Sequence, residues 1–209
     1  MKKNTKKLLA ILLAVVLLVG AVIGGTLAWF TDKTQTVQNT FTVGNIDIEL
    51  DEDDNTKDDE TRTEVGNDYK MIPGYDLSKD PKVTVKANSE KCYVFVKMDK
   101  KIGNVTVGDK TYTFDDFLSY SMADGWTLVP GQTNVFYREV ETSTANQDFA
   151  VIKDNKVIVN ESVTKEMMDA LGTDNAKFPK LDITAYAVQY MNSNSDNFTP
   201  EAAWAIANT

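Results

Sequence analysis

Apolar and polar residues alternate in short runs over most of the chain, which is the pattern of half-buried β-strands. In the run from Asn45 to Leu50, an isoleucine or leucine occupies every second position. The runs 92–98 and 181–190 are apolar on both faces or rich in β-branched and aromatic residues, which is typical of central strands. Further strands are predicted at 83–85, 105–107, 126–129 and 135–140.

The spacing of these runs predicts an all-β fold. A polar turn at Asp154-Asn155 separates the runs 149–152 and 156–159, which indicates a β-hairpin. Helix is sparse: 114–118 offers a single turn, and 164–171 and 200–207 carry the capping residues of short helices. We therefore expect an antiparallel β-sandwich, jelly-roll or immunoglobulin-like, with one or two short helices.

The start of the chain has the composition of an export signal. Four lysines precede an unbroken apolar run over 8–23, and the small residues Thr26 and Ala28 suit the −3 and −1 positions of a signal peptidase site. This run covers only about 24 Å of a hydrocarbon core of ~30 Å. Counting on to Phe30 gives enough length, which leaves an uncleaved membrane anchor as the alternative. We expect an N-terminal hydrophobic signal helix that is cleaved after Ala28.

These patterns divide the chain into three parts. Residues 1–28 are the predicted signal peptide, and the new N-terminus is then Trp29. Residues 29–42 form an extended N-terminal segment, and 43–209 form the β-sandwich domain with an acidic loop at 51–62.

Removal of the leader makes the chain strongly acidic. The 22 basic residues fall by four to 18 against 31 acidic ones, so the net charge becomes −13. This charge repels nucleic acid and anionic lipid, so we expect no nucleic-acid partner and membrane contact only through an uncleaved signal segment. The aromatic content, 10% of all residues, is that of a folded domain rather than a disordered polymer.

The chain contains few of the side-chain types that commonly serve in catalysis and metal binding. The chain has no histidine, which excludes Ser-His-Asp and Cys-His nucleophile systems and histidine-ligated zinc. Its single cysteine, Cys92, lies in an apolar run and is expected to be a small buried hydrophobe rather than a reactive thiol. We therefore expect no enzyme activity, and no catalytic, cofactor-binding or metal-ligating residues.

The acidic segment 51–60 carries seven acids and one lysine. An EF-hand loop starting at Asp51 would need Gly and Glu where the chain has Thr56 and Arg62, so that motif fails. A solvated insertion between strands is expected, with a loose divalent-ion site as the alternative.

The junction 25–50 carries a more specific pattern. An aromatic pair with an acid, Trp29-Phe30-Thr31-Asp32, follows the cleavage site, and a Thr/Asn/Gln-rich stretch leads into a strand. That strand has the form N-x-F-x-x-G-x-I-D-I, from Asn39 to Ile48. This pattern resembles the start of the TasA/camelysin family of exported bacterial proteins. Shorter matches along the rest of the chain, such as the runs at 71–74 and 92–98, continue the resemblance.

The resemblance implies processing by an alternate signal peptidase of the SipW type and a jelly-roll-like sandwich in the cell envelope or biofilm matrix. TasA-like subunits polymerise when the freed N-terminal segment of one subunit completes the sheet of the next. In this chain the candidate donor residues are Phe30, Val37 and Phe41. The alternative is that residues 31–41 form the protein's own first edge strand or a flexible leader. The peptidase activity described for camelysin is not carried over, because the histidines of such a zinc site are missing.

Two functions remain open from the sequence. The first is a secreted structural protein of the cell surface or matrix, a homo-oligomer or fibre assembled through its freed N-terminal segment. The second is a secreted monomeric module that binds carbohydrate or a surface protein through exposed aromatic residues. Candidates for such stacking surfaces are Tyr69, Tyr75, Tyr120 and Trp126.

Overall fold

The computed structural model describes residues 45–57, 61–191 and 196–209. The chain divides into two units, residues 1–43 and 44–209, and the description below concerns the second unit alone. The expected signal helix lies outside the described residues. The same is true of the predicted cleavage and donor residues: Thr26, Ala28, Trp29, Phe30, Val37 and Phe41.

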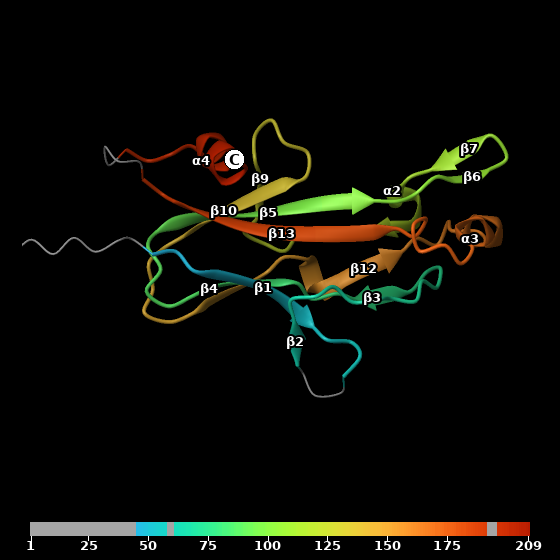
Figure 1. The fold of residues 1–209 in the computed structure, drawn as a ribbon, viewed down its shortest axis with the longest axis horizontal. Coiled ribbons are helices and arrows are strands. Elements are labelled where there is room, and N and C mark those ends of the chain that lie inside the picture. Colours follow the sequence, from blue (N-terminus) through green and yellow to red (C-terminus); the bar gives the residue numbers. More distant parts are fainter. Residues whose placement is uncertain (1–44, 58–60, 192–195) are drawn as a thin grey trace, which may run out of the picture. The chain divides into compact units, whose positions relative to one another are not determined.

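Two four-stranded antiparallel sheets form the body of this unit (Figure 1). The first sheet has the order β11-β4-β1-β2 and the second has the order β13-β5-β10-β9. The strands of the first sheet are β1 (Ile48–Asp53), β2 (Arg62–Thr63), β4 (Lys82–Val85) and β11 (Gln147–Ala150). Those of the second are β5 (Cys92–Lys101), β9 (Thr127–Leu128), β10 (Val135–Val140) and β13 (Lys180–Gln189).

Two smaller sheets lie beside this body. The three-stranded sheet has the order β3-β12-β8. Its central strand, β12, pairs antiparallel with β3 on one side and with β8 on the other. β6 and β7 form a separate hairpin around Gly108, which has a positive φ of 59° at the turn. The bounds are β3 (Asp76–Ser78), β6 (Val105–Val107), β7 (Lys110–Tyr112), β8 (Leu118–Ser119) and β12 (Lys156–Val159).

Three short α-helices begin at capping residues that the sequence contains. α3 (Lys165–Leu171) starts after Thr164, whose side chain accepts a hydrogen bond from the Met167 N–H, and it ends at Gly172. α4 (Pro200–Ala207) has its proline in the first turn and Thr199 as the N-cap. The third helix, α2 (Phe114–Phe117), is a single turn with a capping box.

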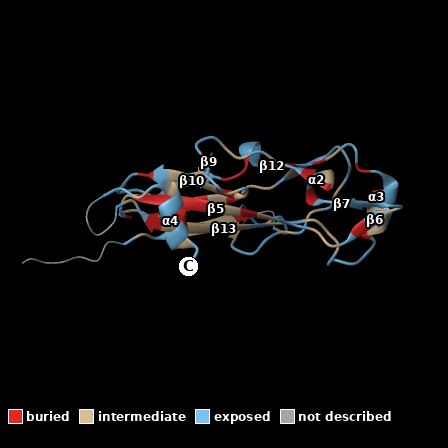
Figure 2. Ribbon diagram, turned by 90° about the horizontal axis from the view of Figure 1, so that it is seen from above, coloured by how far each residue is buried: buried red, intermediate tan, exposed pale blue. Residues whose placement is uncertain are grey.

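The second sheet is buried on both of its faces. Alternate side chains of β5, such as Val94 and Val96, point into the main core between the two four-stranded sheets. The other β5 side chains, including Phe95, point to the opposite face, where Trp204 of α4 covers them with ring centroids 5.5 Å apart. Figure 2 shows α4 lying across buried β5 on this face. A strand buried on both faces reads as a continuous apolar run, which is why 92–98 lacks alternation.

The expected all-β sandwich is confirmed, with three corrections in detail. Three α-helices are present in the described part rather than one or two. The predicted 149–159 hairpin is wrong, because β11 pairs with β4 whereas β12 pairs with β3 and β8. A 3₁₀ turn (Lys153–Asn155) with positive φ at Asp154 and Asn155 redirects the chain between the sheets. The expected acidic loop 51–62 is shorter, because β1 continues to Asp53 and Arg62 belongs to β2.

Cys92 is fully buried at the start of β5, as the sequence predicts. Burial raises the pKa of its thiol to about 11, because the thiolate would lose its hydration.

We expect Cys92 to be nearly inert to thiol reagents in the folded protein. A pKa about two units above that of a free cysteine leaves roughly 100-fold less thiolate at pH 8. Labelling with a chromogenic disulfide should therefore be at least that much slower in buffer than in 6 M guanidinium chloride. Equal rates under both conditions would show that the thiol is accessible.

Candidate functional site

One of the two longest strands of the second sheet has no partner on its outer edge within the described residues. β13 pairs with β5 over ten residues and lies at the end of the sheet. The additional backbone hydrogen bonds of the described chain involve none of the residues 180–189. Because N–H and C=O groups point alternately to the two sides of a strand, about half of those in β13 face outward unpaired.

β1 offers a second unpaired edge next to β13. Its residues from Ile48 to Asp51 pair with β4 on one side, whereas β2 reaches only Glu52 and Asp53 on the other. β1 and β13 lie side by side although they belong to different sheets (Figure 1). The sandwich is therefore open along this side.

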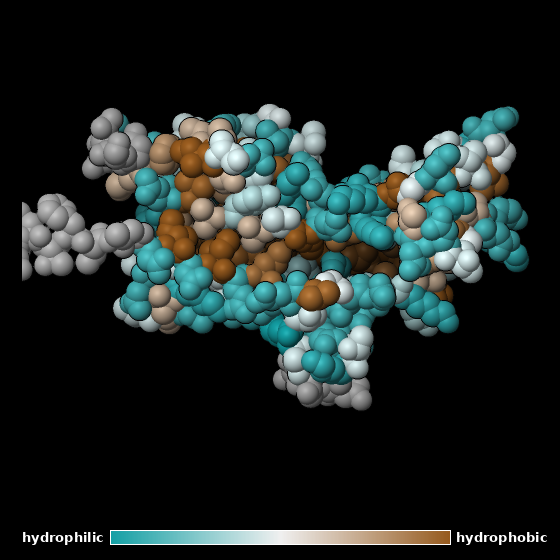
Figure 3. Space-filling model, viewed as in Figure 1, coloured by the Kyte–Doolittle hydropathy of each residue, from teal (hydrophilic) through white to brown (hydrophobic). Residues whose placement is uncertain are grey.

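Half-buried apolar side chains line the opening. They come from alternate positions of the two strands and pack against the main core from its edge. Figure 3 shows them as a hydrophobic band between the hydrophilic surfaces of the two sheets. We call this band the seam, and define it by Ile46, Ile48, Leu50, Leu181, Ile183 and Ala185.

The seam has two distinguishable ends. At one end the Glu90 N–H donates to the Asn45 carbonyl, and the adjacent Lys91 carbonyl accepts from the Tyr190 N–H. We call this the near end, because the described chain enters here. At the far end, the last residues of β1 and the first residues of β13 surround a hollow of about 250 Å³. Leu50, Val65, Pro81, Leu181 and Ile183 provide its apolar wall.

A buried ion pair forms part of the wall of the hollow. Glu52 is only 6% exposed, and one of its carboxylate oxygens lies 2.6 Å from Lys79 Nζ. Its other oxygen accepts hydrogen bonds from the backbone and side-chain amides of Asn67. Burial, together with the charge of Glu52, raises the pKa of nearby Tyr69 to about 12. These contacts fix the segment after β2 against the end of β1.

The opposite side of the sandwich is closed. Trp126 Nε1 donates to the Ala150 carbonyl at 2.8 Å, which ties the chain before β9 to β11. The Arg138 guanidinium lies 3.9 Å from the ring centre of Phe149 and 5.1 Å from that of Trp126. Backbone bonds from Ala123 to Val151 and from Lys153 to Ser121 continue this closure.

The closure contains a charge that the described residues do not neutralise. Arg138 points inward from β10, and its Nε is buried without a hydrogen-bond partner. Burial lowers the pKa of this guanidinium, and the two aromatic faces are its compensating contacts. Closing this side therefore uses a costly arrangement, whereas nothing in the described chain closes the seam.

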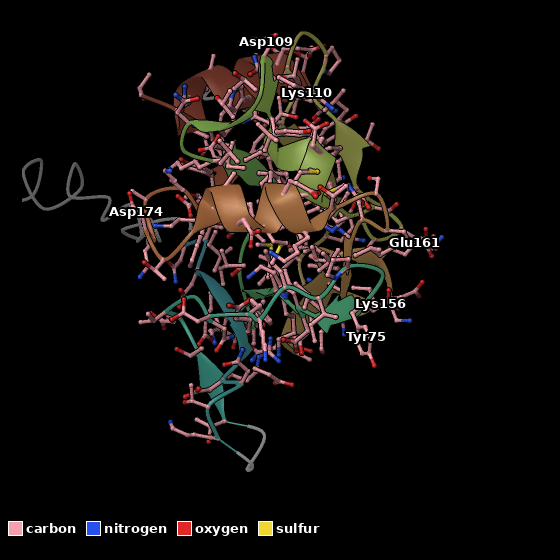
Figure 4. All side chains as sticks on the ribbon, turned by 90° about the vertical axis from the view of Figure 1, so that its right-hand side faces the viewer. Tyr75, Asp109, Lys110, Lys156, Glu161 and Asp174 are labelled. Carbon is pink, nitrogen blue, oxygen red and sulfur yellow. The ribbon has the colours of Figure 1, made fainter. Side chains whose placement is uncertain are left out.

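The aromatic residues proposed as stacking surfaces do not form one platform. Trp126 is buried in the closure, and Tyr69 and Tyr120 are half-buried. Only Tyr75, 63% exposed, fits the expectation. Figure 4 shows Tyr75 with Lys156 and Glu161 on the side of the body away from β1.

The acidic residues near the seam are bound to an arginine. Arg62 Nε lies 2.7 Å from Asp51, and its Nη1 lies 2.9 Å from Asp53 and 2.8 Å from Asp80. Burial opposes the charge of Arg62, but its hydrogen bonds to Asp80 and Asp51 outweigh burial and raise its pKa. The guanidinium thus occupies the position where a divalent cation would meet these carboxylates.

Comparison with known protein families provides independent information about this chain. The sequence model described as camelysin metallo-endopeptidase matches residues 3–117. The chain therefore belongs to the camelysin family, which includes TasA-like proteins, as the sequence resemblance indicated. This membership supports an exported bacterial protein. No curated protein and no solved structure matches the chain.

The family is named for a metallopeptidase, but the described residues do not fit a zinc site of that kind. The sequence lacks histidine, and its one cysteine is buried. In the described ranges, no three His, Cys, Asp or Glu side chains are arranged so that they could hold a metal ion. The absence of enzyme activity therefore stays a prediction. The match to the family model ends at Phe117, so it includes β1 but not β13.

No helix among the described residues has the length and apolar character needed to cross a membrane. The seam is a feature that sequence reasoning missed. Leu181 and Ile183 were assigned to a strand, but a strand's own residues do not show which of its edges remains unpaired.

Arg62→Gln should destabilise the fold. The change removes hydrogen bonds to three carboxylates and leaves them close together without a cation. We expect a loss of about 2 kcal/mol in the free energy of unfolding, or roughly 4–8 °C in Tm. Differential scanning calorimetry measures both.

Lys165→Gln is the matched control, because its pair with Asp169 on α3 is highly exposed. Its Tm should stay that of the unmodified protein. An unchanged Tm for Arg62→Gln as well would contradict a structural role for the arginine.

Proposed function

We propose that this chain is a non-enzymatic structural protein of the bacterial cell surface or biofilm matrix. Its subunits associate into fibres when the freed N-terminal segment of one copy occupies the seam of the next. The observation that supports this proposal is the seam itself, in which two unpaired strand edges flank an apolar band. An added strand would satisfy the unpaired backbone groups of β13 and cover part of the apolar band.

The length of the N-terminal segment matches the opening. Residues 29–41 number thirteen and span about 43 Å when extended at ~3.3 Å per residue. The unpaired edge of β13 is ten residues long, which corresponds to about 34 Å. The segment is therefore long enough to cover the whole edge.

The residue pattern of the segment also fits a strand with one buried face. Val37 and Phe41 are four residues apart, so they share a face in an extended strand. Thr36, Gln38 and Thr40 fall on the other face, where they tolerate solvent, whereas Asn39 shares the face of Val37 and Phe41. Phe30 falls on that other face, so we assign the apolar anchoring to Val37 and Phe41.

A second copy is the more accessible occupant of the seam. At the near end the Asp47 carbonyl accepts from the Lys86 N–H, and its own N–H donates to the Ser89 hydroxyl. The chain is thus held in place immediately before β1, and its own segment would have to reverse direction within a few residues to enter the seam. A segment from another copy enters without such a turn.

The binding-module alternative has less support. It needs exposed aromatic residues near one another, whereas the described chain exposes Tyr75 and largely covers the other three candidates. The seam, in contrast, brings together features that a monomer would leave unused.

Mixing two complementary variants tests the proposal. Deletion of residues 29–41 leaves the seam without a donor, and Ile183→Lys places a charge in the seam while keeping the donor segment. We expect each variant alone to remain monomeric after processing. A 1:1 mixture should form dimers but no fibres, because each dimer uses the one donor and the one seam available. Light scattering with size exclusion, together with electron microscopy, gives the readout.

The matched control is Ile158→Lys, which alters an exposed isoleucine of β12 on another sheet. Fibres from this variant should equal those of the unmodified protein. Fibres from the deletion variant would overturn the donor role of residues 29–41. A monomeric full-length protein whose segment resists proteolysis would show that the segment fills its own seam.

Assembly should increase with ionic strength. Processed subunits with a net charge of −13 repel one another, and the repulsion is screened when the Debye length falls from about 10 Å at 0.1 M salt to ~3 Å at 1 M. The concentration needed for fibres, followed by light scattering, should therefore decrease as NaCl rises. An increase would mean that ion pairs between subunits dominate the contact.

A further inference from the structure

We propose that Lys79 and Asn67 become joined by an amide bond between their side chains, and that Glu52 serves as the acid–base group of this reaction. The three residues form the buried polar cluster beside the hollow. The inference is independent of the proposed function, because it concerns chemistry within one subunit. It assigns this cluster as a covalent modification site that needs no cofactor.

Glu52 holds the amine and the amide on one carboxylate. Its Oε2 lies 2.6 Å from Lys79 Nζ, and its Oε1 accepts a hydrogen bond of 3.0 Å from Asn67 Nδ2. The two reacting groups are therefore separated by no more than the width of one carboxylate group. Lysine has a flexible four-carbon stem, so rotation of its last bonds can carry Nζ from the carboxylate to the amide carbon.

The Asn67 amide is fixed in position and polarised by its neighbours. Nδ2 also donates to the Asp53 carbonyl at 2.6 Å, and Oδ1 accepts from the Asn55 N–H at 3.0 Å. Negative charge develops on this oxygen when an amine attacks the amide carbon. A backbone N–H placed at that oxygen stabilises the charge, as the donors of an oxyanion hole do.

Burial favours a reaction that removes the charges of this cluster. The side chains of Lys79 and Glu52 are only 13% and 8% exposed. The ring of Tyr69 lies beside the lysine, with its centre 5.5 Å from Nζ. Taking an ammonium and a carboxylate out of water carries a desolvation cost, which their mutual attraction only partly offsets. Conversion of the pair to neutral groups relieves that cost.

The reaction balances without an oxidant or a further reactant. Glu52 accepts one proton from the Lys79 ammonium, and the lone pair of the resulting amine attacks Cγ of Asn67. The Nζ–Cγ bond forms, a second Nζ proton passes to Nδ2 through the Glu52 carboxyl group, and the Cγ–Nδ2 bond breaks. Ammonia leaves and Glu52 retains the first proton, so both charges of the ion pair disappear.

The bond would close a covalent loop near the end of β1. Asn67 follows β2, and Lys79 lies between β3 and β4, so the loop contains the thirteen residues 67–79. A closed loop restricts the unfolded chain in the way that a disulfide does. The chain has one cysteine, buried in β5, so an intramolecular disulfide is not available for this purpose.

Mass spectrometry of the full-length protein, denatured just before measurement, tests the proposal. We expect the main species to be lighter than its sequence by one ammonia, about 17 Da. Trypsin does not cut after an acylated lysine, so the digest should contain the peptide 63–70 joined to 71–82. This branched peptide distinguishes the bond from ammonia lost at another asparagine.

Two variants test the roles of the amine and the carboxylate. Lys79→Arg keeps a cation beside Glu52 but has no nucleophilic amine, so the ammonia loss and the branched peptide should both be absent. Glu52→Gln removes the proton acceptor, and the reaction should slow by about 100-fold or more. Lys156→Arg is the matched control, because its ion pair with Asp76 is about half exposed, and it should react fully.

Each outcome decides for or against the bond. An unmodified protein with the full mass of its sequence and no branched peptide would overturn the proposal. Ammonia loss that persists in Lys79→Arg would show that it arises elsewhere. Loss of one water, with Lys79 linked to Glu52, would overturn the role of Asn67. Fibre formation enters none of these readouts, so they are separate from the test of assembly.

Discussion

Unpaired backbone groups along β13 are the feature on which the rest of this protein depends. A strand in the middle of a sheet satisfies its N–H and C=O groups on both sides, but β13 has β5 on one side alone within the described chain. Edge strands in soluble proteins are usually short, bulged or covered, because a long open edge pairs with other chains. β13 is instead among the longest strands of the described domain, and it is flanked by apolar side chains.

The two sides of the sandwich differ in how they are closed, and this difference shows that the open edge of β13 is specific to one side. On the closed side the fold places Arg138 between two aromatic rings and leaves its buried Nε without a partner. An unsatisfied buried polar group is destabilising, so closure there has a cost that the Trp126 hydrogen bond and the ring contacts offset. On the seam side, β1 and β13 form no backbone hydrogen bonds with each other within the described residues. The fold is therefore able to close one side of the sandwich, and only the side of the seam stays open in the described chain.

Local chemistry explains which parts of this fold the sequence predicts. The strands at 83–85, 105–107 and 135–140 follow from alternation and flanking turn residues, and α3 and α4 follow from Thr164, Gly172 and Pro200. These signals act within a few residues. The 149–159 hairpin failed because its two strands meet partners far away in sequence, and the turn at Asp154 changes sheet instead of reversing within one. Pairing partners are chosen by tertiary packing, which no short window of sequence contains.

The same distinction explains the acidic segment. A run of seven acids suggests that these side chains are exposed to solvent. Glu52 is nevertheless buried, because Lys79 and Asn67, both distant in sequence, bind its carboxylate. The open seam could not be predicted either, because the sequence of a strand does not show which of its edges stays unpaired in the fold. The cleavage site and the donor segment stay predictions, because the residues that carry them lie outside the described part of the chain.

Charge and edge together indicate how such a subunit avoids indiscriminate association. A strongly acidic surface keeps identical bodies apart at low ionic strength, so two open edges do not readily meet. Under the proposed function, the segment 29–41, which carries one Asp and one Lys, has no net side-chain charge and would approach the seam without that repulsion. Selectivity for a neutral segment over a second acidic body would then follow from charge, and specific recognition of a metal or substrate would not be required.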